Sequence, residues 1–507
     1  MVFGLTLAYR FLGFAREAIL AAFLGNSPAA DAYYIAYSIP YVVVNIVALG
    51  SIASAAVPIL TPFVETGDKA GLTNFIGRAL GRLLPALTLI CALLIVLAEP
   101  MTKLFAPGFD HQTRALAVNL TRVMTLMILP LGLSGLYSAI SLAHKNFGIT
   151  PAANFIFNSV MVLGGLTALM LNNLQVLAGS VLVAALSQFF FNLMAVSRQQ
   201  SVGFQPAWGL TDHPLTMFIK ALSPICLSVA LTMANPVIGR AMASGLDSGS
   251  IASLNYAEKV YQLPLGVLVG AAAGVMLPFL SRAIASEDML ELRKLYDDSR
   301  KALGFLLAPI ILILVFFSVP VINVLFERGH FGPEDSLRTA GSLRWFALAL
   351  PGAMLMEITN RVFYAFSEAK KTFYLALLIT VANAILAFAF SRSLGQNGIA
   401  IALAVSVSLG YLAARLMLSR SKAGLEIKMN IGASLKTILA LIIMTVGVFY
   451  LASPVNHFIL QQIWIARVAL LVATTIGLYI LFALLLNLFG VMQLKAIWFK
   501  LKAKRAR

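Results

Sequence analysis

The chain has 507 residues, of which 60% are hydrophobic and only 11% are charged, and its mean hydropathy is +0.90. Soluble domains are about half apolar and a quarter charged, so this composition excludes an ordinary water-soluble protein and indicates a chain whose solvent is the lipid bilayer. The net charge of +17 does not predict nucleic-acid binding, because the basic residues are scattered among short loops.

A helix needs about 20 mostly apolar residues to cross roughly 30 Å of hydrocarbon. The first such run, 2–24, is a span rather than a signal peptide, because Arg10, Arg16 and Glu17 interrupt it. The other runs are 30–63 (broken by prolines), 81–101, 117–142, 150–171, 174–196, 215–243, 250–281, 303–326, 340–366, 372–392, 396–419, 434–453 and 464–490. We therefore expect an all-α polytopic membrane protein of about 14 transmembrane helices.

The distribution of basic residues predicts the orientation. Lys and Arg accumulate in cytoplasmic loops, and with the N-terminus inside, the loops on that side carry most of them. The C-terminal tail adds Lys500, Lys502, Lys504, Arg505 and Arg507 to the same side. Both termini are therefore predicted to be cytoplasmic.

The sequence contains an internal repeat. LFAPG begins at Leu104 and LFERG at Leu325, 221 residues later, and Tyr37-x-x-Pro40 recurs as Tyr261-x-x-Pro264. Because this offset spans six helices, an even number, the halves have the same orientation, as in some secondary transporters. We expect two parallel six-helix lobes, residues 1–200 and 201–425, followed by helices 13 and 14 and a basic cytoplasmic tail in residues 426–507.

The sequence contains no recognisable motif of an enzyme or of a bound cofactor. The five histidines are dispersed, and we find neither a zinc-protease motif nor an ATP-binding loop nor a nucleophile elbow. Cys91 and Cys226 lie in apolar runs, which favours buried free thiols over a disulfide or a metal site. We expect no enzyme activity, no cofactor and no metal. Transport would be driven by a gradient, by the membrane potential or by the downhill movement of the substrate itself.

Charges at membrane depth are the informative residues, because each costs several kcal/mol unless it faces a wet cavity or a partner. They include Glu357 and a predicted substrate-binding set of Arg10, Arg16, Glu17, Asp31, Arg240, Glu258, Lys259 and Arg361. Cations outnumber anions in that set, and arginine holds phosphate groups through paired hydrogen bonds. The set therefore predicts an anionic ligand.

Simpler readings exist for several of these residues. Arg16 and Glu17 would also fit a span end near the interface, with side chains that reach toward water. Glu357 and Arg361, four residues apart, would fit an ion pair within one helix. Asp31 precedes an apolar run and would fit the N-cap of its own helix.

Five segments carry a family resemblance. They are YRFLGFAREAILAAFLG at the start, ADAYYIAYSIP, LFERGHFGPED, ASLNYAEKVYQLPLGVL and RVFYAFSEAKKT. Together they resemble the MurJ/MviN lipid II flippases of the multidrug/oligosaccharidyl-lipid/polysaccharide exporter superfamily over essentially the whole chain. The resemblance implies two six-helix lobes around a cationic cavity and a terminal helix pair that forms a groove for a polyprenyl tail. The family's first-span arginines fall on Arg10 and Arg16, its next acidic residue on Glu17, and its early second-span aspartate on Asp31.

The chain departs from the family pattern in its second and eighth spans. Where the family usually has a basic pair and then an acidic-glycine step, this chain has Val44-Asn45 and Leu49-Gly50. The usual Asp-Arg of span 8 is Glu258-Lys259 here, and span 7 offers Arg240 rather than a carboxylate for sodium. The sodium site of some relatives is therefore not carried over to this chain.

The expected function is that of a flippase for the undecaprenyl-pyrophosphate-linked peptidoglycan precursor, lipid II, working by alternating access in the bacterial inner membrane. Its partners would be lipid II, membrane lipid and the peptidoglycan synthesis machinery, with no nucleic acid. The altered second span motivates an alternative, a flippase for another polyprenyl-linked oligosaccharide of capsule, exopolysaccharide or O-antigen. A drug exporter fits less well, because it predicts an apolar cavity with little positive charge.

Overall fold

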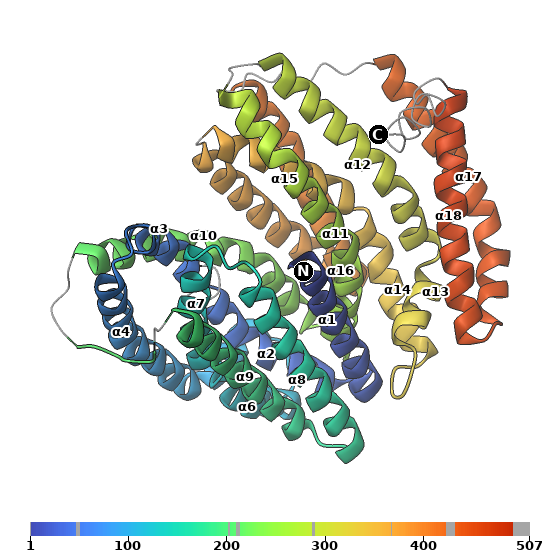
Figure 1. Cartoon of the computed structure of the whole chain (residues 1–507). Helices are drawn as coiled ribbons and strands as arrows, with labels where there is room; N and C mark the ends of the chain where they lie inside the picture. The colour runs from blue at the N-terminus through green and yellow to red at the C-terminus, as the bar shows by residue number, and fades with distance from the viewer. Residues whose placement is uncertain are drawn as a thin grey trace. The chain divides into compact units, whose positions relative to one another are not determined.

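The computed structural model describes residues 2–46, 51–200, 203–208, 213–285, 289–366, 368–421 and 431–489, and these ranges consist of helices and their connections, without any strand (Figure 1). Within them, nine helices are long and apolar enough to cross a membrane. The predicted all-α polytopic fold is therefore confirmed. Leu49-Gly50 and the basic tail from Lys500 to Arg507 lie outside the described residues.

The helices of the first half are α1 (Val2–Leu24), α2 (Pro28–Val44), α3 (Ser51–Thr66), α4 (Lys69–Val96), α5 (Ala98–Phe105), α6 (His111–Thr125), α7 (Ile128–Ala143), α8 (Ile149–Leu171), α9 (Leu174–Gln200) and α10 (His213–Ala243). Those that follow are α11 (Ser250–Ala285), α12 (Met289–Phe316), α13 (Ser318–Phe326), α14 (Pro333–Ala347), α15 (Leu350–Ala365), α16 (Ala369–Ser419), α17 (Ile431–Leu460) and α18 (Trp464–Leu488).

Most predicted spans correspond to one helix or to two consecutive helices. The spans at 30–63, 81–101, 117–142, 303–326 and 340–366 each cover two helices, from α2–α3 to α14–α15. Conversely, the spans at 372–392 and 396–419 both lie in α16, where Gly395 interrupts the helical backbone with a φ of 56°. With these breaks taken into account, the described helices agree with about 14 spans.

The turn between α1 and α2 shows how local sequence sets the helix ends. Gly25 has a φ of +57° just after α1, a left-handed conformation that glycine adopts without strain. The Ser27 hydroxyl then accepts a hydrogen bond from the Ala30 amide, and Pro28 occupies the first turn of α2. These residues bring two long helices into a hairpin through a three-residue connection.

The helix bounds repeat along the chain, as the recurring motifs predict. α4 begins at Lys69 and α12 at Met289, 220 residues later, and both have 28 residues. A short helix follows each, α5 or α13, and then pairs of 15 and 16 residues, α6–α7 and α14–α15. The same succession of long, short and paired helices in both halves supports an origin from one repeated unit.

The chain packs into two compact units. Unit 1 contains Met1–Tyr256 together with Arg328–Gly332, and unit 2 contains Ala257–Glu327 and Pro333–Arg507. Within unit 1, α1 packs against α8, α2 against α6, and α10 against α3. Within unit 2, α15 packs against α16 and α13 against α14. The predicted lobe boundaries at 200/201 and 425/426 stay predictions.

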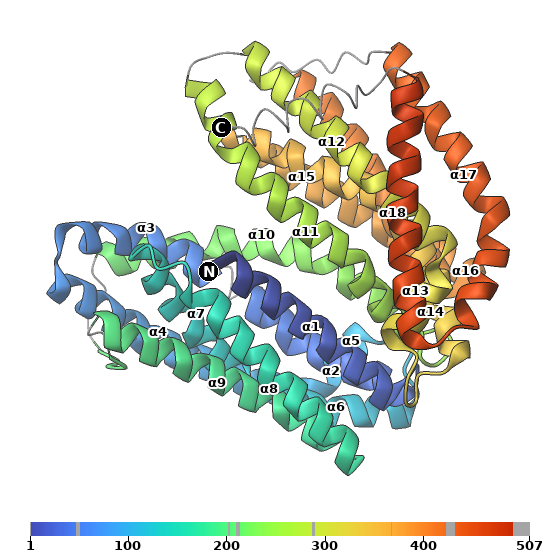
Figure 2. The same ribbon diagram turned by 45° about the vertical axis from the view of Figure 1, so that its right-hand side comes forward.

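The terminal pair α17–α18 is attached to α12 and α13 of unit 2, and Figure 2 shows these four helices together. The Trp464 indole donates to the Val324 carbonyl over 2.9 Å, and Arg467 Nη1 donates to Asn323 Oδ1 over 2.5 Å. Phe317, from the turn between α12 and α13, lies in one buried cluster with Met444 and Phe482 of the pair. Apolar packing and side-chain hydrogen bonds thus both hold the terminal pair.

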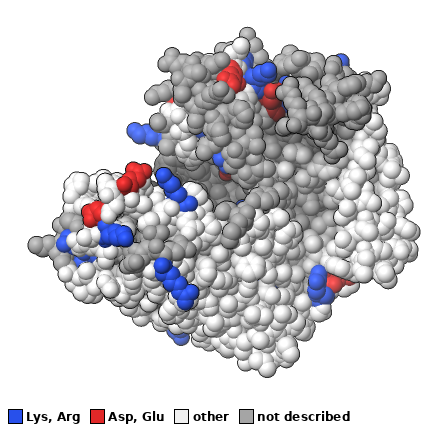
Figure 3. Space-filling model, viewed as in Figure 1, with Lys and Arg blue, Asp and Glu red and all other residues white. Residues whose placement is uncertain are grey.

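Much of the outer surface suits lipid. Broad areas of the face in Figure 3 carry neither basic nor acidic side chains, and the charged side chains gather in a few places. The terminal pair also exposes many large apolar side chains, among them Leu439, Phe449, Ile465 and Leu488. Hydrocarbon tolerates such a surface and water does not.

Candidate functional site

The centre of the candidate site is an ion pair between neighbours on α1. Arg16 Nη2 lies 2.6 Å from Glu17 Oε1, and the two side chains are 14% and 3% exposed. Arg16 Nε is buried and has no hydrogen-bond partner in the part of the chain that the structure describes. The alternative in which both residues reach out to an interface is therefore wrong, because both side chains are enclosed by protein.

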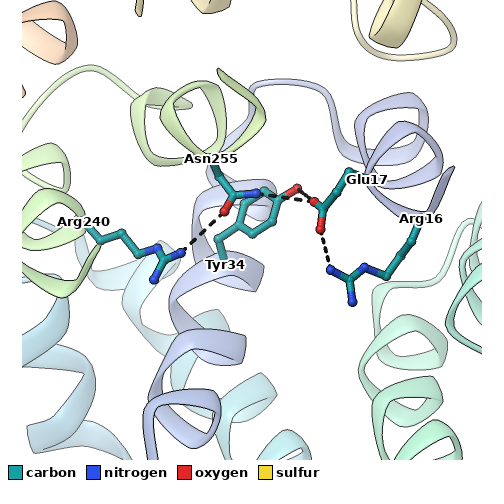
Figure 4. A network of polar contacts seen from close by, with 5 residues as sticks. All are labelled: Arg16, Glu17, Tyr34, Arg240 and Asn255. Atoms are coloured by element: carbon teal, nitrogen blue, oxygen red, sulfur yellow. Dashed lines mark hydrogen bonds and ion pairs between the residues drawn. The ribbon is translucent and has the colours of Figure 1, made fainter. Parts of the chain in front are cut away.

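The second oxygen of Glu17 receives two further donors. The Tyr34 hydroxyl of α2 donates to Oε2 over 3.0 Å, and the Asn255 side-chain amide of α11 donates to the same atom over 3.4 Å (Figure 4). A carboxylate with one ion pair and two donors is stabilised in its charged form even when buried. Glu17 is thus fully engaged by protein groups from three helices.

Asn255 connects Glu17 to a second arginine. Its amide nitrogen faces Glu17, and its amide oxygen accepts a long hydrogen bond of 3.5 Å from Arg240 Nη2 near the end of α10 (Figure 4). All of these residues belong to unit 1. Unit 1 therefore holds two cations around one anion, linked by a neutral amide.

The charge balance of this network favours an anionic ligand. Two guanidinium groups and one carboxylate leave a net positive charge, and a buried charge is costly without compensation. Arg16 carries five N–H donors, of which Nη2 donates to Glu17 and Nε has no partner among the described residues. Arginine is the residue best suited to a phosphate group, because its planar fork donates two hydrogen bonds at once.

Asp31 is occupied by backbone groups. Its carboxylate, 4% exposed, accepts hydrogen bonds from the Gly249 amide at 2.7 Å and the Ala252 amide at 2.8 Å. It therefore caps the first turn of α11, where unpaired amides favour an anion. The reading of Asp31 as the N-cap of its own helix is wrong, because Ser27 takes that position.

The segment Arg328–Gly332 covers the C-terminal end of α1. The His330 amide donates to the Ala22 carbonyl over 2.8 Å. Phe331 is 1% exposed and meets the Tyr256 ring edge to face, with 5.4 Å between centroids. Gly329 has a φ of +59° there, and a Cβ at this position would overlap the Ala22 carbonyl oxygen.

The LFAPG motif makes a related contact at the end of α10. The Gly108 amide donates to the Ser244 hydroxyl over 3.0 Å, and a Cβ on Gly108 would overlap the backbone of Gly245. The glycine of each repeated motif therefore serves the same purpose, which is to let a loop approach the backbone at a helix end.

None of the other predicted residues forms a hydrogen bond or ion pair with this network among the described side chains. Arg10 is exposed on α1. Glu258 and Lys259 are half-buried residues of α11 in unit 2, and Glu258 accepts a hydrogen bond from Gln262 over 2.8 Å. Arg361 is half-buried on α15 of unit 2 and forms no ion pair with Glu357 among the described side chains. The intrahelical ion pair considered for these two residues is therefore not formed.

Sequence reasoning from charges missed Tyr34 and Asn255. Both are uncharged, so the cost of burying an ion does not single them out. They lie inside the segments ADAYYIAYSIP and ASLNYAEKVYQLPLGVL, which carry the family resemblance, and that is the one signal that could have pointed to them. Across the described ranges, no group of three or more His, Cys, Asp or Glu side chains is placed to hold a metal ion.

Comparisons with known proteins identify the family. The family model described as "Lipid II flippase MurJ" matches residues 20–468. A protein of Rhizobium tropici named "Probable lipid II flippase MurJ" is 32% identical over 411 residues, which cover 79% of this chain and 76% of the relative.

Two solved structures share the fold. One is titled "Lipid II flippase MurJ, inward closed conformation", with a TM-score of 0.80 and 23% identity over 95% of this chain and 97% of that one. The other is an inward-facing multidrug resistance MATE family transporter, with a TM-score of 0.68 and 16% identity over 81% of this chain and 95% of that one. Because the family match covers most of its length, the chain belongs to the lipid II flippase MurJ family.

Proposed function

We propose that this protein flips lipid II from the cytoplasmic to the outer leaflet of the bacterial inner membrane, with both of its termini in the cytoplasm. The observation that carries the proposal is the enclosed Arg16, whose Nε has no partner, in a chain of the lipid II flippase MurJ family. The peptidoglycan synthesis machinery is the source and the consumer of this substrate.

Arg16 is the proposed first contact for the pyrophosphate. Its ion pair with Glu17 uses Nη2, so the buried Nε, which has no partner among the described residues, remains to donate to a phosphate oxygen. Glu17 acts in this proposal as a positioning residue, because its oxygens are already taken by Arg16, Tyr34 and Asn255. Arg240 completes the cationic face from α10.

The remaining predicted residues have supporting roles in the proposal. Arg10, Lys259 and Arg361 supply further positive charge for the anionic headgroup, and Glu258 balances part of it. Asp31 holds the start of α11 in place, so its contribution is structural. The headgroup would occupy water-filled space between the helices while the polyprenyl tail stays in lipid.

Alternating access requires the closed end of α1 to open. By the predicted topology this end faces the outside, and here it is held by the hydrogen bond from His330 to Ala22 and by the packing of Phe331 on Tyr256. These contacts would break for the headgroup to leave. An inside-negative potential would favour outward movement of an anion by roughly 2.3 kcal/mol per charge per 100 mV.

The test is lipid II transport by purified protein in liposomes, comparing the unaltered chain with Arg16→Ala and Arg16→Lys. Arg392→Ala is the matched control, because Arg392 is an exposed arginine that lies over Phe388 on α16. We expect Arg16→Ala to abolish transport, Arg16→Lys to retain part of it, and the control to transport normally. Normal transport by a folded Arg16→Ala protein would refute the role of Arg16.

Cells depleted of their own lipid II flippase test the substrate. Growth restored by this chain supports lipid II as the substrate. Failure to restore growth, with transport of another polyprenyl-linked oligosaccharide by the same preparation, would favour the alternative that the Val44-Asn45 departure motivates.

A further inference from the structure

Three tyrosines form a stacked row along one face of α2. Tyr33 and Tyr37 lie with 6.3 Å between ring centroids and an interplanar angle of 13°, and Tyr37 and Tyr41 with 5.3 Å and 23°. Their spacing of four residues puts them on successive turns of the helix. We call Tyr33, Tyr37 and Tyr41 the tyrosine ladder.

The ladder runs from the protein interior to an accessible surface. Tyr33 is 2% exposed, Tyr37 is half-buried, and Tyr41 is 37% exposed. The outer end of the ladder, the Tyr41 ring, is therefore accessible to a ligand.

The contact between Arg16 and Tyr37 shows that the tyrosine ladder lies next to a charged group. The Arg16 guanidinium carbon lies 5.9 Å from the centroid of the Tyr37 ring, the geometry of a cation–π contact. A guanidinium does not face hydrocarbon without a large cost. The side of α2 that carries Tyr37 is thus the side that faces the Arg16 guanidinium.

The register between α1 and α2 gives the height of a second cation, Arg10, relative to the ladder. Glu17 meets Tyr34 and Arg16 meets Tyr37, so residue numbers fall along α1 as they rise along α2. Arg10 precedes Arg16 by six residues, or about 9 Å of helix. Arg10 therefore belongs to the level of Tyr41, and it is exposed there.

From this arrangement we propose that the Tyr37–Tyr41 end of the ladder is a platform for the pyranose ring attached to the pyrophosphate. An aromatic ring presents an electron-rich face, and the C–H groups on one face of a pyranose carry partial positive charge and pack against it. The first sugar is bonded directly to the pyrophosphate, so a phosphate group on Arg16 puts that sugar next to Tyr37 and Tyr41. This inference rests on the proposed function and extends it to the glycan.

The platform would allow the site to distinguish polyprenyl pyrophosphates that carry a sugar from those that do not. Arg16 recognises the pyrophosphate whether or not a sugar is attached, whereas the ladder gains contact area from a sugar alone. In a chain with Val44 and Asn45 where the family usually has a basic pair, the aromatic face supplies affinity that added charge supplies elsewhere.

The experiment compares the binding of two lipids to the full-length protein in nanodiscs. The first is lipid II, and the second is undecaprenyl pyrophosphate, which lacks the glycan. The variants are Tyr41→Ala, Tyr41→Phe and, as a matched control, Tyr374→Ala, because Tyr374 is an exposed tyrosine of α16 in unit 2. Thermal unfolding of each variant checks that it folds.

We expect Tyr41→Ala to weaken lipid II binding by about fivefold to tenfold, the effect of one lost aromatic contact, and to leave undecaprenyl pyrophosphate binding unchanged. Tyr41→Phe keeps the ring and should bind both lipids as the unaltered protein does, as should Tyr374→Ala. Unchanged affinity of Tyr41→Ala for lipid II, or an equal loss for both lipids, would overturn the platform.

Failure of the proposed function has a different signature. It appears in the unaltered protein, as an absence of lipid II transport. The same pair of measurements is then made with another polyprenyl-pyrophosphate-linked oligosaccharide. A glycan-dependent loss in Tyr41→Ala would still support the platform, and no such loss would overturn it.

Discussion

The side-chain amide of Asn255 donates a hydrogen bond to the carboxylate of Glu17, with 3.4 Å between Nδ2 and Oε2, across 238 residues of sequence. This contact joins the first helix of the chain to the start of α11. Because the same amide accepts from Arg240, its orientation is set by a donor on one side and an acceptor on the other. A neutral residue thereby organises the charges around it.

Asn255→Leu removes both of these hydrogen bonds at similar volume. We expect the free energy of unfolding to fall by about 1 kcal/mol, since a buried carboxylate loses a donor, and lipid transport to fall because Glu17 and Arg240 are no longer held together. Chemical denaturation and the liposome assay measure the two effects. Asn119→Leu, at an exposed position of α6, is the control. Full transport by a stable Asn255→Leu protein would contradict a positioning role.

Gly329→Ala tests the closed end of α1. Gly329 combines a positive φ with a space too small for a Cβ, which would meet the Ala22 carbonyl. We expect a destabilisation of about 1–3 kcal/mol from backbone strain and overlap, seen as a lower midpoint of thermal unfolding. Gly332→Ala is the matched control in the same segment, because a Cβ there meets no atom within 4 Å. Equal midpoints for the two variants would argue against the close approach.

Asp110 provides a prediction about pH. The pKa of Asp110 is lowered because its carboxylate accepts hydrogen bonds from the Thr113 hydroxyl, then from the amides of Thr113 and Gln112, at the start of α6. Since the folded protein favours the ionised form, the stabilisation is complete above the unfolded pKa of about 3.9. It is lost as the pH falls through the lower folded value.

Asp110→Ala should therefore unfold at a lower temperature than the unaltered protein, by a constant difference between about pH 5 and pH 7. Below about pH 4 the difference between the two unfolding temperatures should become smaller. Thermal unfolding at a series of pH values measures it. The sign is fixed by the direction of the shift, because protonation removes an interaction that only the carboxylate makes. If the difference in unfolding temperature stayed the same down to low pH, the ionised carboxylate of Asp110 would not be the form that caps α6.

The membrane fold was predictable because its causes are local. Long apolar runs, glycine and proline at helix ends, and repeated loop motifs are all visible in sequence, and α8 and α18 begin and end within a few residues of the predicted spans. The short breaks that split α4 from α5 and α12 from α13 were not predicted. Such breaks depend on how a helix end packs against its neighbours, and an apolar pattern continues through them unchanged.

The candidate site was predictable in part. The cost of a charge in the bilayer singles out Arg16 and Glu17, and the structure brings them together at 2.6 Å. The same argument also singled out Asp31, whose oxygens are taken by backbone amides of α11. A sequence shows that a buried carboxylate needs partners, but it does not show which groups they are.

The sequence by itself determined that this is a polytopic helical protein with buried cations, because hydrophobicity and charge act through the solvent that each residue requires. The tertiary structure alone decided that Glu17 meets Tyr34 and Asn255, and that Tyr37, in a row of three tyrosines on α2, meets Arg16. These are contacts between uncharged and charged groups far apart in the chain. They depend on the register between helices, which packing sets.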